Sequence, residues 1–392
     1  MAGPRPETLK REKSKRKISD KAFQYTLDLM SQHLSFEAAP NRSYTPKEIN
    51  MCLLYMCLNE EYAEGGMSAL SSEIELPNRV PTGRTVRNRL QTQNAREILA
   101  EVTQANDALL YKLRQFGVFR RRVTVAIDFT RNLFYGDHEH TPRVLGGKYE
   151  KGTCYGYKYA SIHVVEAGKR LTICTLPIDE FSEKVDVVEK LLSEAKVRGI
   201  HIGYVLLDRE FFTEAVIQLL KSLHLKFIMP AVKNDKVKDA IRRYHNKEAP
   251  AVQRGFPLGK ETFTLVVYEK TKEQLQEASG IVDRYFVFAT NLSEPKARCL
   301  YSFIPQEYKR RWGIETGYRV QDDAEAMTTS TNYAYRLLLH LCSVLVYNIW
   351  QYANLLLAKV LHCTLSRPLV ALKILASHMQ RLIVCGLGPP KR

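Results

Sequence analysis

The sequence predicts an α/β fold in which a mixed β-sheet is flanked by helices. From residue 122 onward, short apolar runs rich in β-branched and aromatic residues alternate with amphipathic segments. Before residue 119, apolar residues recur at helical spacing instead. At about 231–305, further strand-like runs interrupt the alternation. We therefore expect a helical N-terminal domain, an α/β domain and a β-rich insertion within it.

The first twenty residues are polar and strongly basic, most densely in the run KREKSKRK at Lys10–Lys17. Blocks of like charge repel one another and do not build a core, so we expect residues 1–20 to form a disordered arm. Such an arm could be a solvated tail, a contact for phosphate groups or a nuclear address.

Residues 21–118 are expected to form a helical domain. Thr45 is a candidate helix cap, and Pro46 suits the first position of the helix that follows. A short helix in GGMSALSSEI, a turn and a basic helix in PTGRTVRNRLQ suggest a helix-turn-helix. Arg84, Arg87 and Arg89 are its candidate DNA-binding residues. Ordinary packing in a helical bundle explains the same pattern.

Residues 119–360 are expected to form the α/β domain. Its strand candidates lie at 122–128, 158–166, 170–176, 204–208 and 225–230, and its helix candidates lie at 184–199 and 213–223. The order β-β-β-α-β-α-β predicts helices layered on a mixed sheet. The insertion contains a polar helix candidate at 233–247 and strand candidates at 262–270 and 285–291.

The end of the chain is expected to be helical. A helix with Pro305 near its N-terminus begins it, and residues 361–392 are expected to form a C-terminal helix and tail. Leu337–Leu361 is long enough to cross a bilayer, but six polar residues within it are costly in lipid. A buried helix, and no membrane association, are therefore predicted.

Composition points to a polyanionic partner. The 392 residues carry a net charge of +16 with a pI near 9.4, which favours DNA, RNA or an acidic membrane surface. The eight cysteines form no Cys-x-x-Cys pair, and no signal peptide opens the chain. We expect a reducing compartment with buried thiols, which means the cytoplasm, in association with the nucleoid, if the protein is prokaryotic.

Three carboxylates stand in contexts that suggest a metal site. Asp128 and Asp208 each end an apolar strand candidate, and Glu315 lies in a helix candidate. A strand end fixes the backbone while the side chain reaches the crevice beyond the sheet. Oxygen ligands without a His or Cys pattern favour two Mg²⁺ ions, or Mn²⁺ in their place. Either aspartate alone could instead cap a turn.

Around Glu315, several polar side chains recur at steps of three or four. Residues at these steps share one helix face. They could serve a metal and phosphates, or form surface ion pairs between Arg311, Glu315 and Arg319. The residues are Tyr308, Arg311, Glu315, Arg319 and Asp322.

These segments resemble the insertion-sequence DDE transposases that carry a Y-x2-R-x3-E-x6-K motif. Tyr308-x2-Arg311-x3-Glu315 matches that signature, and VAIDFT and LLDREFF resemble the segments that hold its two aspartates. KGTCYGYKYASIHVV resembles the strand pair after the first aspartate, and the likeness spans about residues 120–350. One departure is Asp322, which stands where the signature has its closing Lys. This puts a hairpin route of excision in doubt.

The resemblance implies an RNase H-like core in which Asp128, Asp208 and Glu315 are the catalytic metal ligands. It implies cleavage at the ends of a mobile element, transfer of the 3′-hydroxyl to target DNA, and a homodimer on paired ends. Arg311 and Arg319 would clamp phosphates, and Tyr308 would contact the DNA backbone. Trp312 could stack on a base or lie in the core.

Other residues are weaker candidates. Lys148, Lys151 and Lys158 could follow the DNA backbone, although exposed lysines often have no specific role. Glu210 could reach the same crevice, and the run Asp137-His138-Glu139-His140 resembles a metal site in a hairpin loop. Three alternative functions stay open: an idle or repurposed DNA-binding protein, a structure-selective nuclease, and a membrane protein that uses Leu337–Leu361.

Overall fold

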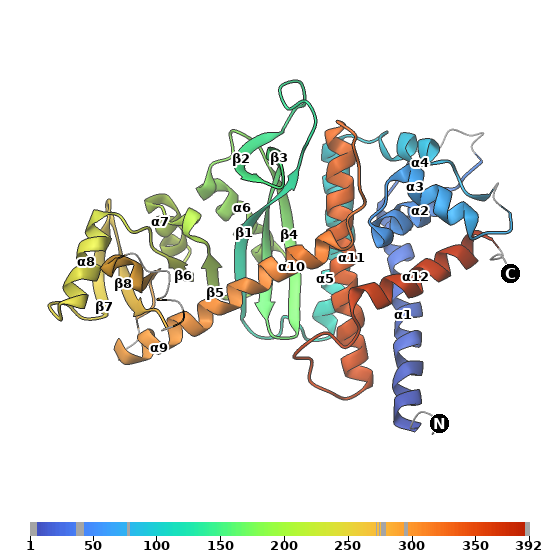
Figure 1. Ribbon diagram of the computed structural model, residues 1–392. Coiled ribbons are helices and arrows are strands. Elements are labelled where there is room, and N and C mark those ends of the chain that lie inside the picture. The colour runs from blue at the N-terminus through green and yellow to red at the C-terminus, as the bar shows by residue number, and fades with distance from the viewer. Residues whose placement is uncertain are drawn as a thin grey trace.

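The computed structural model describes residues 6–36, 43–76, 79–271, 273, 275, 280–293 and 297–388. Its strands are β1 (Val123–Leu133), β2 (Leu145–Glu150), β3 (Thr153–Glu166), β4 (Lys169–Ile178), β5 (Ile202–Leu207), β6 (Lys226–Pro230), β7 (Val252–Leu258), β8 (Glu261–Glu269) and β9 (Tyr285–Thr290). In this part of the chain they form one sheet in the order β2-β3-β1-β5-β6-β9-β8-β7, with β4 also paired to β3 (Figure 1). Because β1 is antiparallel to β3 and parallel to β5, the sheet is mixed, as predicted.

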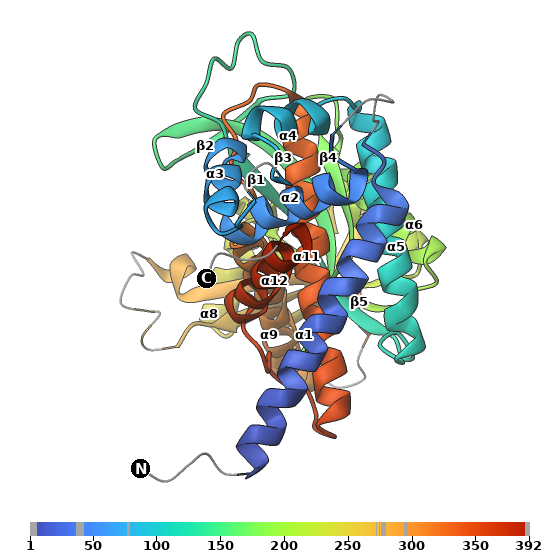
Figure 2. The same ribbon diagram turned by 90° about the vertical axis from the view of Figure 1, so that its right-hand side faces the viewer.

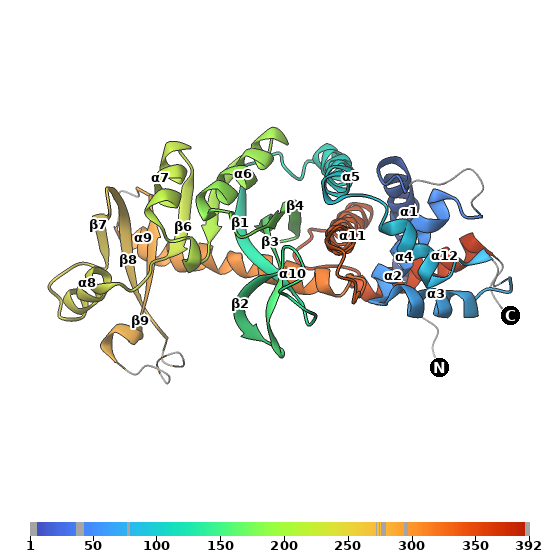
Figure 3. The same ribbon diagram turned by 90° about the horizontal axis from the view of Figure 1, so that it is seen from above.

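Helices cover both faces of this sheet and also form a bundle beside it. They are α1 (Pro6–His33), α2 (Pro46–Asn59), α3 (Ala63–Ser72), α4 (Gly83–Leu90), α5 (Ala95–Gln115), α6 (Lys184–Val197), α7 (Glu214–Ser222), α8 (Asp235–His245), α9 (Ala297–Tyr308), α10 (Trp312–Asp322), α11 (Tyr333–Val360) and α12 (Leu372–Leu387). Helices α6 and α7 lie on one face, whereas α9 and α10 cross the other (Figure 3). Helices α5 and α11 pack together beside β4.

The β-rich insertion continues the central sheet. β9 pairs with β6, with Ile228 opposite Thr290, and β8 pairs with β9. The predicted helix is α8, and the two predicted strands are β8 and β9. The sequence pattern misses β2 and β7, because both are largely exposed strands that lack regular apolar alternation.

The basic arm is a correction to the sequence prediction. Within the described residues, the stretch 10–20 is not disordered but belongs to α1. Ile18, Ala22 and Phe23 are buried, and α1 packs against α11 and α12 (Figure 2). The lysines and arginines therefore occupy a helix whose far end is anchored by apolar contacts. Residues 1–5 lie outside the described part.

Helix α11 is the buried helix that the polar residues in Leu337–Leu361 predict. It is the one described helix long and apolar enough to span a membrane, yet 89% of its most apolar window is buried inside the protein. Its polar side chains find partners there: Trp350 Nε1 donates to the Val370 carbonyl at 2.7 Å, and Asn354 Oδ1 accepts from the Val370 amide at 2.9 Å. Among the described cysteines none forms a disulfide, but Cys363 and Cys385 are exposed, which corrects the expectation of uniformly buried thiols.

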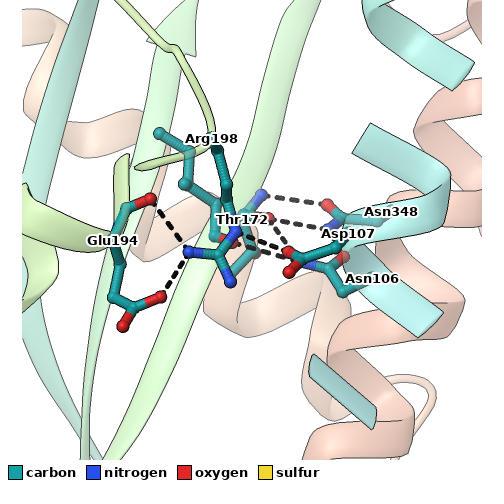
Figure 4. A network of polar contacts seen from close by, with 7 residues as sticks. Asn106, Asp107, Thr172, Glu194, Arg198 and Asn348 are labelled. Atoms are coloured by element: carbon teal, nitrogen blue, oxygen red, sulfur yellow. Dashed lines mark hydrogen bonds and ion pairs between the residues drawn. The ribbon is translucent and has the colours of Figure 1, made fainter. Parts of the chain in front are cut away.

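Two buried asparagines cover the open edge of β4 (Figure 4). Asn348 of α11 accepts a hydrogen bond from the Thr172 amide at 2.9 Å and donates one to the Thr172 carbonyl at 2.8 Å. Asn348 also donates to Asn106 of α5 at 2.7 Å. An uncovered edge strand leaves backbone groups unpaired, so these side chains replace the missing neighbour strand. Arg198, paired with Asp107 and Glu194, joins α6 to the same region.

Candidate functional site

Asp128 lies inside β1, not at its end. β1 continues to Leu133 because residues 129–133 still pair with β3, although its other neighbour, β5, stops at Leu207 opposite Ile127. The Asp128 side chain is buried, and its Oδ1 accepts from the Phe129 amide at 2.9 Å. Asp128 thus lies beside the carboxyl end of β5, although its own strand continues past it.

Asp208 follows the last residue of β5 and precedes a 3-10 turn at Arg209–Phe211. Because Ile127 of β1 is level with Leu207 of β5, the next residues, Asp128 and Asp208, are neighbours across the parallel pair. Asp208 is half-buried. The register of two strands therefore brings together two aspartates that lie far apart in the sequence.

Glu315 reaches the same place through Arg311. The Arg311 guanidinium donates from Nη1 to Asp128 Oδ2 at 2.8 Å and from Nη2 to Glu315 Oε1. Arg311 is buried, with 7% of its surface exposed. The structure thus joins a carboxylate of β1 to one of α10 by a single arginine that the Tyr308–Arg311–Glu315 spacing singles out.

The helix that carries Glu315 is interrupted, which corrects the prediction of one continuous helix. Helix α9 ends at Tyr308, a 3-10 turn spans Lys309–Arg311, and α10 begins at Trp312. Tyr308 still lies near Arg311, whose guanidinium carbon is 5.7 Å from the tyrosine ring centre. Arg319 and Asp322 are exposed. The predicted face of polar residues is therefore buried at Arg311 and exposed toward the end of α10.

Trp312 is 60% exposed, so it is not a core residue. The indole is accessible on the surface directly after the turn that carries Arg311. This exposure excludes the core role, and stacking on a base stays a prediction.

Two glycines let α10 approach the sheet. A Cβ on Gly317 would lie 3.1 Å from His163 Nδ1, and one on Gly313 would lie 3.2 Å from Val165 Cβ. Tyr318 also faces the sheet, and its hydroxyl donates to the Asp128 carbonyl at 2.9 Å. Sequence reasoning missed Tyr318, although its position three residues after Glu315 on an amphipathic helix is a usable signal.

The site concentrates negative charge around one buried cation. The pKa of Asp128 is raised to about 7, mainly by burial, and Asp208 and Glu210 add to the rise while Arg311 and the Phe129 amide oppose it. Burial disfavours the charged form of Arg311, but the surrounding side chains together raise its pKa. The carboxylates therefore need a positive partner, and Arg311 is that partner in this structure.

The three carboxylates suit a hard divalent cation, but in this structure Arg311 occupies the space between two of them. Asp128, Asp208 and Glu315 offer only carboxylate oxygens, the ligands that Mg²⁺ prefers. Among the described residues, no group of three or more His, Cys, Asp or Glu side chains is arranged to hold a metal ion. Arg311 lies between two of the three acids, so a cation could reach both only if the guanidinium moved.

The other metal-like run, at 137–140, lies in an exposed loop. His140 Nδ1 and Asp137 Oδ2 are 2.7 Å apart, and the His138 ring stacks on Tyr155. These side chains are thus engaged with neighbours on the surface.

An open cleft of about 1080 Å³ lies next to the acids. Lys148, Lys151 and Lys158 line it together with Phe129 and Glu210, among other residues. Lys158 is half-buried, with its Nζ 3.8 Å from the centre of the Phe129 ring, and desolvation lowers its pKa. The three predicted lysines thus share one cleft, a result that their spacing does not reveal.

Sequence reasoning missed Arg131, which also lines the cleft. Its Nη1 donates to the Cys154 carbonyl at 2.9 Å, and it lies 3.6 Å from a Glu150 carboxylate oxygen. Arg131 therefore supports the β2–β3 hairpin that forms one wall of the cleft.

The three arginines predicted to bind DNA in the N-terminal domain differ in their exposure. Arg84 is exposed, and Arg87 pairs with Glu64 at 2.5 Å. Arg89 is buried and donates to the Phe36 carbonyl at 3.1 Å, which corrects its prediction as an accessible DNA-binding residue. Helices α3 and α4 do form a tight pair, in which a Cβ on Gly83 would lie 2.5 Å from the Glu64 backbone.

Residues 120–323 match the family model described as a transposase DDE domain. Among solved structures, the fold resembles the piggyBac transposase in a synaptic complex with hairpin DNA. The TM-score is 0.57 at 11% identity, over 95% of this chain and 80% of that one. The Mos1 strand transfer complex also matches, at 11% identity over 75% of this chain and 82% of that one, but with a TM-score of 0.19. No curated protein sequence matches the chain.

Proposed function

The chain belongs to the transposase DDE domain family, and from that premise we propose that it cuts DNA at the ends of a mobile element and joins the freed 3′-hydroxyl to target DNA. In this proposal, residues 119–360 carry the catalysis and residues 21–118 contribute to DNA binding. The observation that carries the proposal is the convergence of Asp128, Asp208 and Glu315 around Arg311.

The three carboxylates would hold two Mg²⁺ ions, or Mn²⁺ in their place. When bound, such ions lower the pKa of water and neutralise charge on the phosphodiester. Asp128 is suited to the shared position because it is buried on the central strand and oriented by the Phe129 amide. Asp208 and Glu315 approach it from a neighbouring strand and from the covering helix. Arg311, once displaced from these acids, would contact phosphate oxygens.

The DNA would enter the cleft beside the acids. Its walls carry cations that can bind the backbone, and an exposed indole nearby can stack on a base. The proposed DNA contacts are Tyr308, Arg311, Trp312, Arg319, Lys148, Lys151, Lys158, Arg84 and Arg87. A homodimer would hold two element ends together, because each chain has one such site among its described residues.

The test is strand cleavage by purified full-length protein on oligonucleotides. They carry the terminal inverted repeats that sequencing of the DNA beside the gene identifies, and the reaction contains Mg²⁺. We expect Asp128→Asn, Asp208→Asn and Glu315→Gln each to reduce cleavage by at least about 100-fold while DNA binding persists. Asp186→Asn on the exposed side of α6 is the matched control and should cleave like wild type.

Three outcomes would contradict the proposal. Full metal-dependent cleavage by the Asp208→Asn variant would exclude the carboxylate assignment. Wild-type protein that binds the ends and cuts nothing would instead favour a repurposed DNA-binding protein. Cutting of branched or nicked DNA without joining would favour the structure-selective nuclease.

A further inference from the structure

A group of cations gathers at the end of the sheet opposite the carboxylates. We call it the amino-edge cluster, and it consists of Arg120, Arg121, Arg122, Lys169 and Lys226. Arg120, Arg121, Arg122 and Lys226 are exposed, and Lys169 is half-exposed. None of the roles proposed above uses these residues.

The strand register places the cluster on one edge. Arg122 directly precedes Val123, where β1 starts, and Val123 pairs with Ile202 at the start of β5. Lys226 begins β6 and lies opposite Tyr204. This edge forms the lower end of the central strands in Figure 1.

Lys169 reaches the same edge through the β3–β4 hairpin. It begins β4 and pairs with Glu166 at the end of β3. β3 runs antiparallel to β1, with Val164 opposite Val125, so its last residues lie beside the first residues of β1. Asp128 stands five positions after Val123 on β1, about 17 Å away at the usual rise of a strand. The cluster is therefore separate from the carboxylate site.

The cations line two hollows in the surface. Arg120, Arg121 and Lys169 line one of about 600 Å³, together with Gly117. Arg122 and Lys226 line a second of about 310 Å³. These side chains thus border concave surface, into which a ligand could settle.

Glu166 and Glu307 share the second hollow with Arg122, Lys226 and Arg310, so they offset part of the positive charge there but not all of it. Glu166 accepts from the Thr124 amide at 3.1 Å, and Glu307 accepts from the Thr124 hydroxyl at 2.9 Å. Glu307 also pairs with Arg310 at 3.1 Å. Both carboxylates are therefore engaged around β1.

Within the described parts of the chain, no ion pair or side-chain hydrogen bond links Arg120, Arg121 or Arg122 to another residue. Three adjacent, exposed guanidinium groups concentrate positive charge on this surface, which attracts polyanions. Guanidinium groups bind phosphate oxygens in a geometry that ammonium groups cannot reproduce.

The extent of the cluster fits a DNA duplex. Lys169 and Lys226 lie four strands apart across the sheet (β4, β3, β1, β5, β6), which is about 19 Å at the usual strand spacing. One strand of a duplex places about six phosphates along that length. A small anion would leave most of these cations unpaired.

From this geometry we infer that the amino-edge cluster binds the phosphate backbone of a second DNA duplex, distinct from the one at the carboxylates. The inference rests on the proposed function, in which paired element ends bring more than one duplex to the protein. The amino ends of the strands thus bind one duplex, and the carboxyl ends of the same sheet bind another.

The test uses the full-length chain and two double variants of equal charge change. Arg120→Glu with Arg121→Glu removes two members of the cluster, and Arg242→Glu with Arg243→Glu alters two exposed arginines of α8. Fluorescence anisotropy measures the affinity for a short duplex of arbitrary sequence over a range of salt concentrations. Native mass spectrometry with excess duplex counts the duplexes bound per chain.

We expect the cluster variant to lose one bound duplex per chain. In the salt titration, we expect the slope of log affinity against log salt concentration to fall in magnitude by about 2 relative to the control variant. An unchanged slope and stoichiometry would overturn the inference and leave an acidic protein as the partner. A reduced slope with one duplex per chain in both proteins would also overturn it, because the cluster would then touch the same DNA as the carboxylates.

These results are independent of catalysis. If wild-type protein cuts no DNA but the cluster variant still loses the second duplex, the proposed function fails and the inference stands. If cleavage depends on Asp128 and the cluster variant behaves like its control, the reverse holds.

Discussion

Arg311 holds the buried Asp128 and the half-buried Glu315, two carboxylates that would otherwise repel one another. Its guanidinium contacts Asp128 and Glu315 at once, and side-chain exposure is 9% for Arg311 and 12% for Asp128. A buried charge that loses its partner is strongly destabilising, because neither water nor a counter-ion replaces the partner. The residue therefore has a structural task in addition to the proposed contact with DNA.

We predict that Arg311→Ala lowers the free energy of unfolding by about 3 kcal/mol in metal-free buffer. Because the substitution leaves the acids without a cation, Mg²⁺ should restore more stability to this variant than to wild type. Urea unfolding with and without Mg²⁺ measures both effects. Arg319→Ala, on the exposed side of α10, is the control and should change neither.

His163 predicts a pH dependence of stability. Burial lowers its pKa from 6.5 to about 3. The unfolded chain thus takes up a proton at a higher pH than the folded chain does. His163 consequently favours the folded state fully above pH 6.5, and this contribution is lost as the pH falls from 6.5 toward 3.

The matched measurement is urea unfolding of wild type and His163→Gln across that pH range. The stability of wild type should fall more steeply with acid than that of the variant. The exposed His201→Gln should give a curve parallel to wild type. If the His163→Gln curve were equally parallel, the assignment of this pH dependence to His163 would be wrong.

At the scale of elements, α10 can lie close to the sheet because Gly313 and Gly317 have no side chains. The helix lies so close to β3 that a methyl group at position 317 would crowd the His163 ring. Since a packed interior yields little, an added methyl must push the helix away or distort its neighbours. Glu315 would move with the helix.

We therefore predict that Gly317→Ala destabilises the protein by about 1–3 kcal/mol. The variant should also weaken Mg²⁺ binding, measured calorimetrically on protein without DNA. Thr316→Ala changes the neighbouring, exposed position and should affect neither property appreciably. A stable Gly317→Ala variant with unaltered Mg²⁺ affinity would show that the close approach is not required.

Local pattern predicts the buried elements of this fold well and the exposed or interrupted ones poorly. The runs that precede Asp128 and Asp208 stand out because their residues are apolar. The full length of β1 is hidden, because its last residues pair with β3 alone. The break between α9 and α10 is hidden too, because it coincides with the docking of Arg311 onto β1, a tertiary contact.

The candidate site shows the same division. Residue type and spacing single out Asp128, Asp208, Glu315 and Arg311, and the strand register and hydrogen bonds then bring them together. Spacing alone does not reveal that Arg311 lies between the acids, or that Arg89 faces inward. Both facts depend on segments far away in the chain, so only the folded structure contains them.

At the scale of the whole molecule, α11 joins the sheet to the N-terminal helices. It packs against α5, β4, α1 and α10, and Asn348 completes the edge of β4. The sheet and the helical domain thus depend on a helix that begins only at residue 333.

We predict that a chain ending after residue 332 does not unfold cooperatively, because β4 and α5 lose their covering helix. A chain ending after Val370 lacks α12 but keeps α11, and it should retain a cooperative transition at a lower temperature. Circular dichroism during heating distinguishes the two. A sharp transition in the shorter chain would show that the sheet is stable without α11.

The late position of α10 and α11 also has a consequence during synthesis. A ribosome delivers Asp128 and Asp208 long before Glu315, and the helix that covers β4 comes later still. A nascent or prematurely terminated chain therefore holds two of the three acids without the scaffold that aligns them. Gene copies that lose their 3′ end would encode products without Glu315 and without the helix that covers β4.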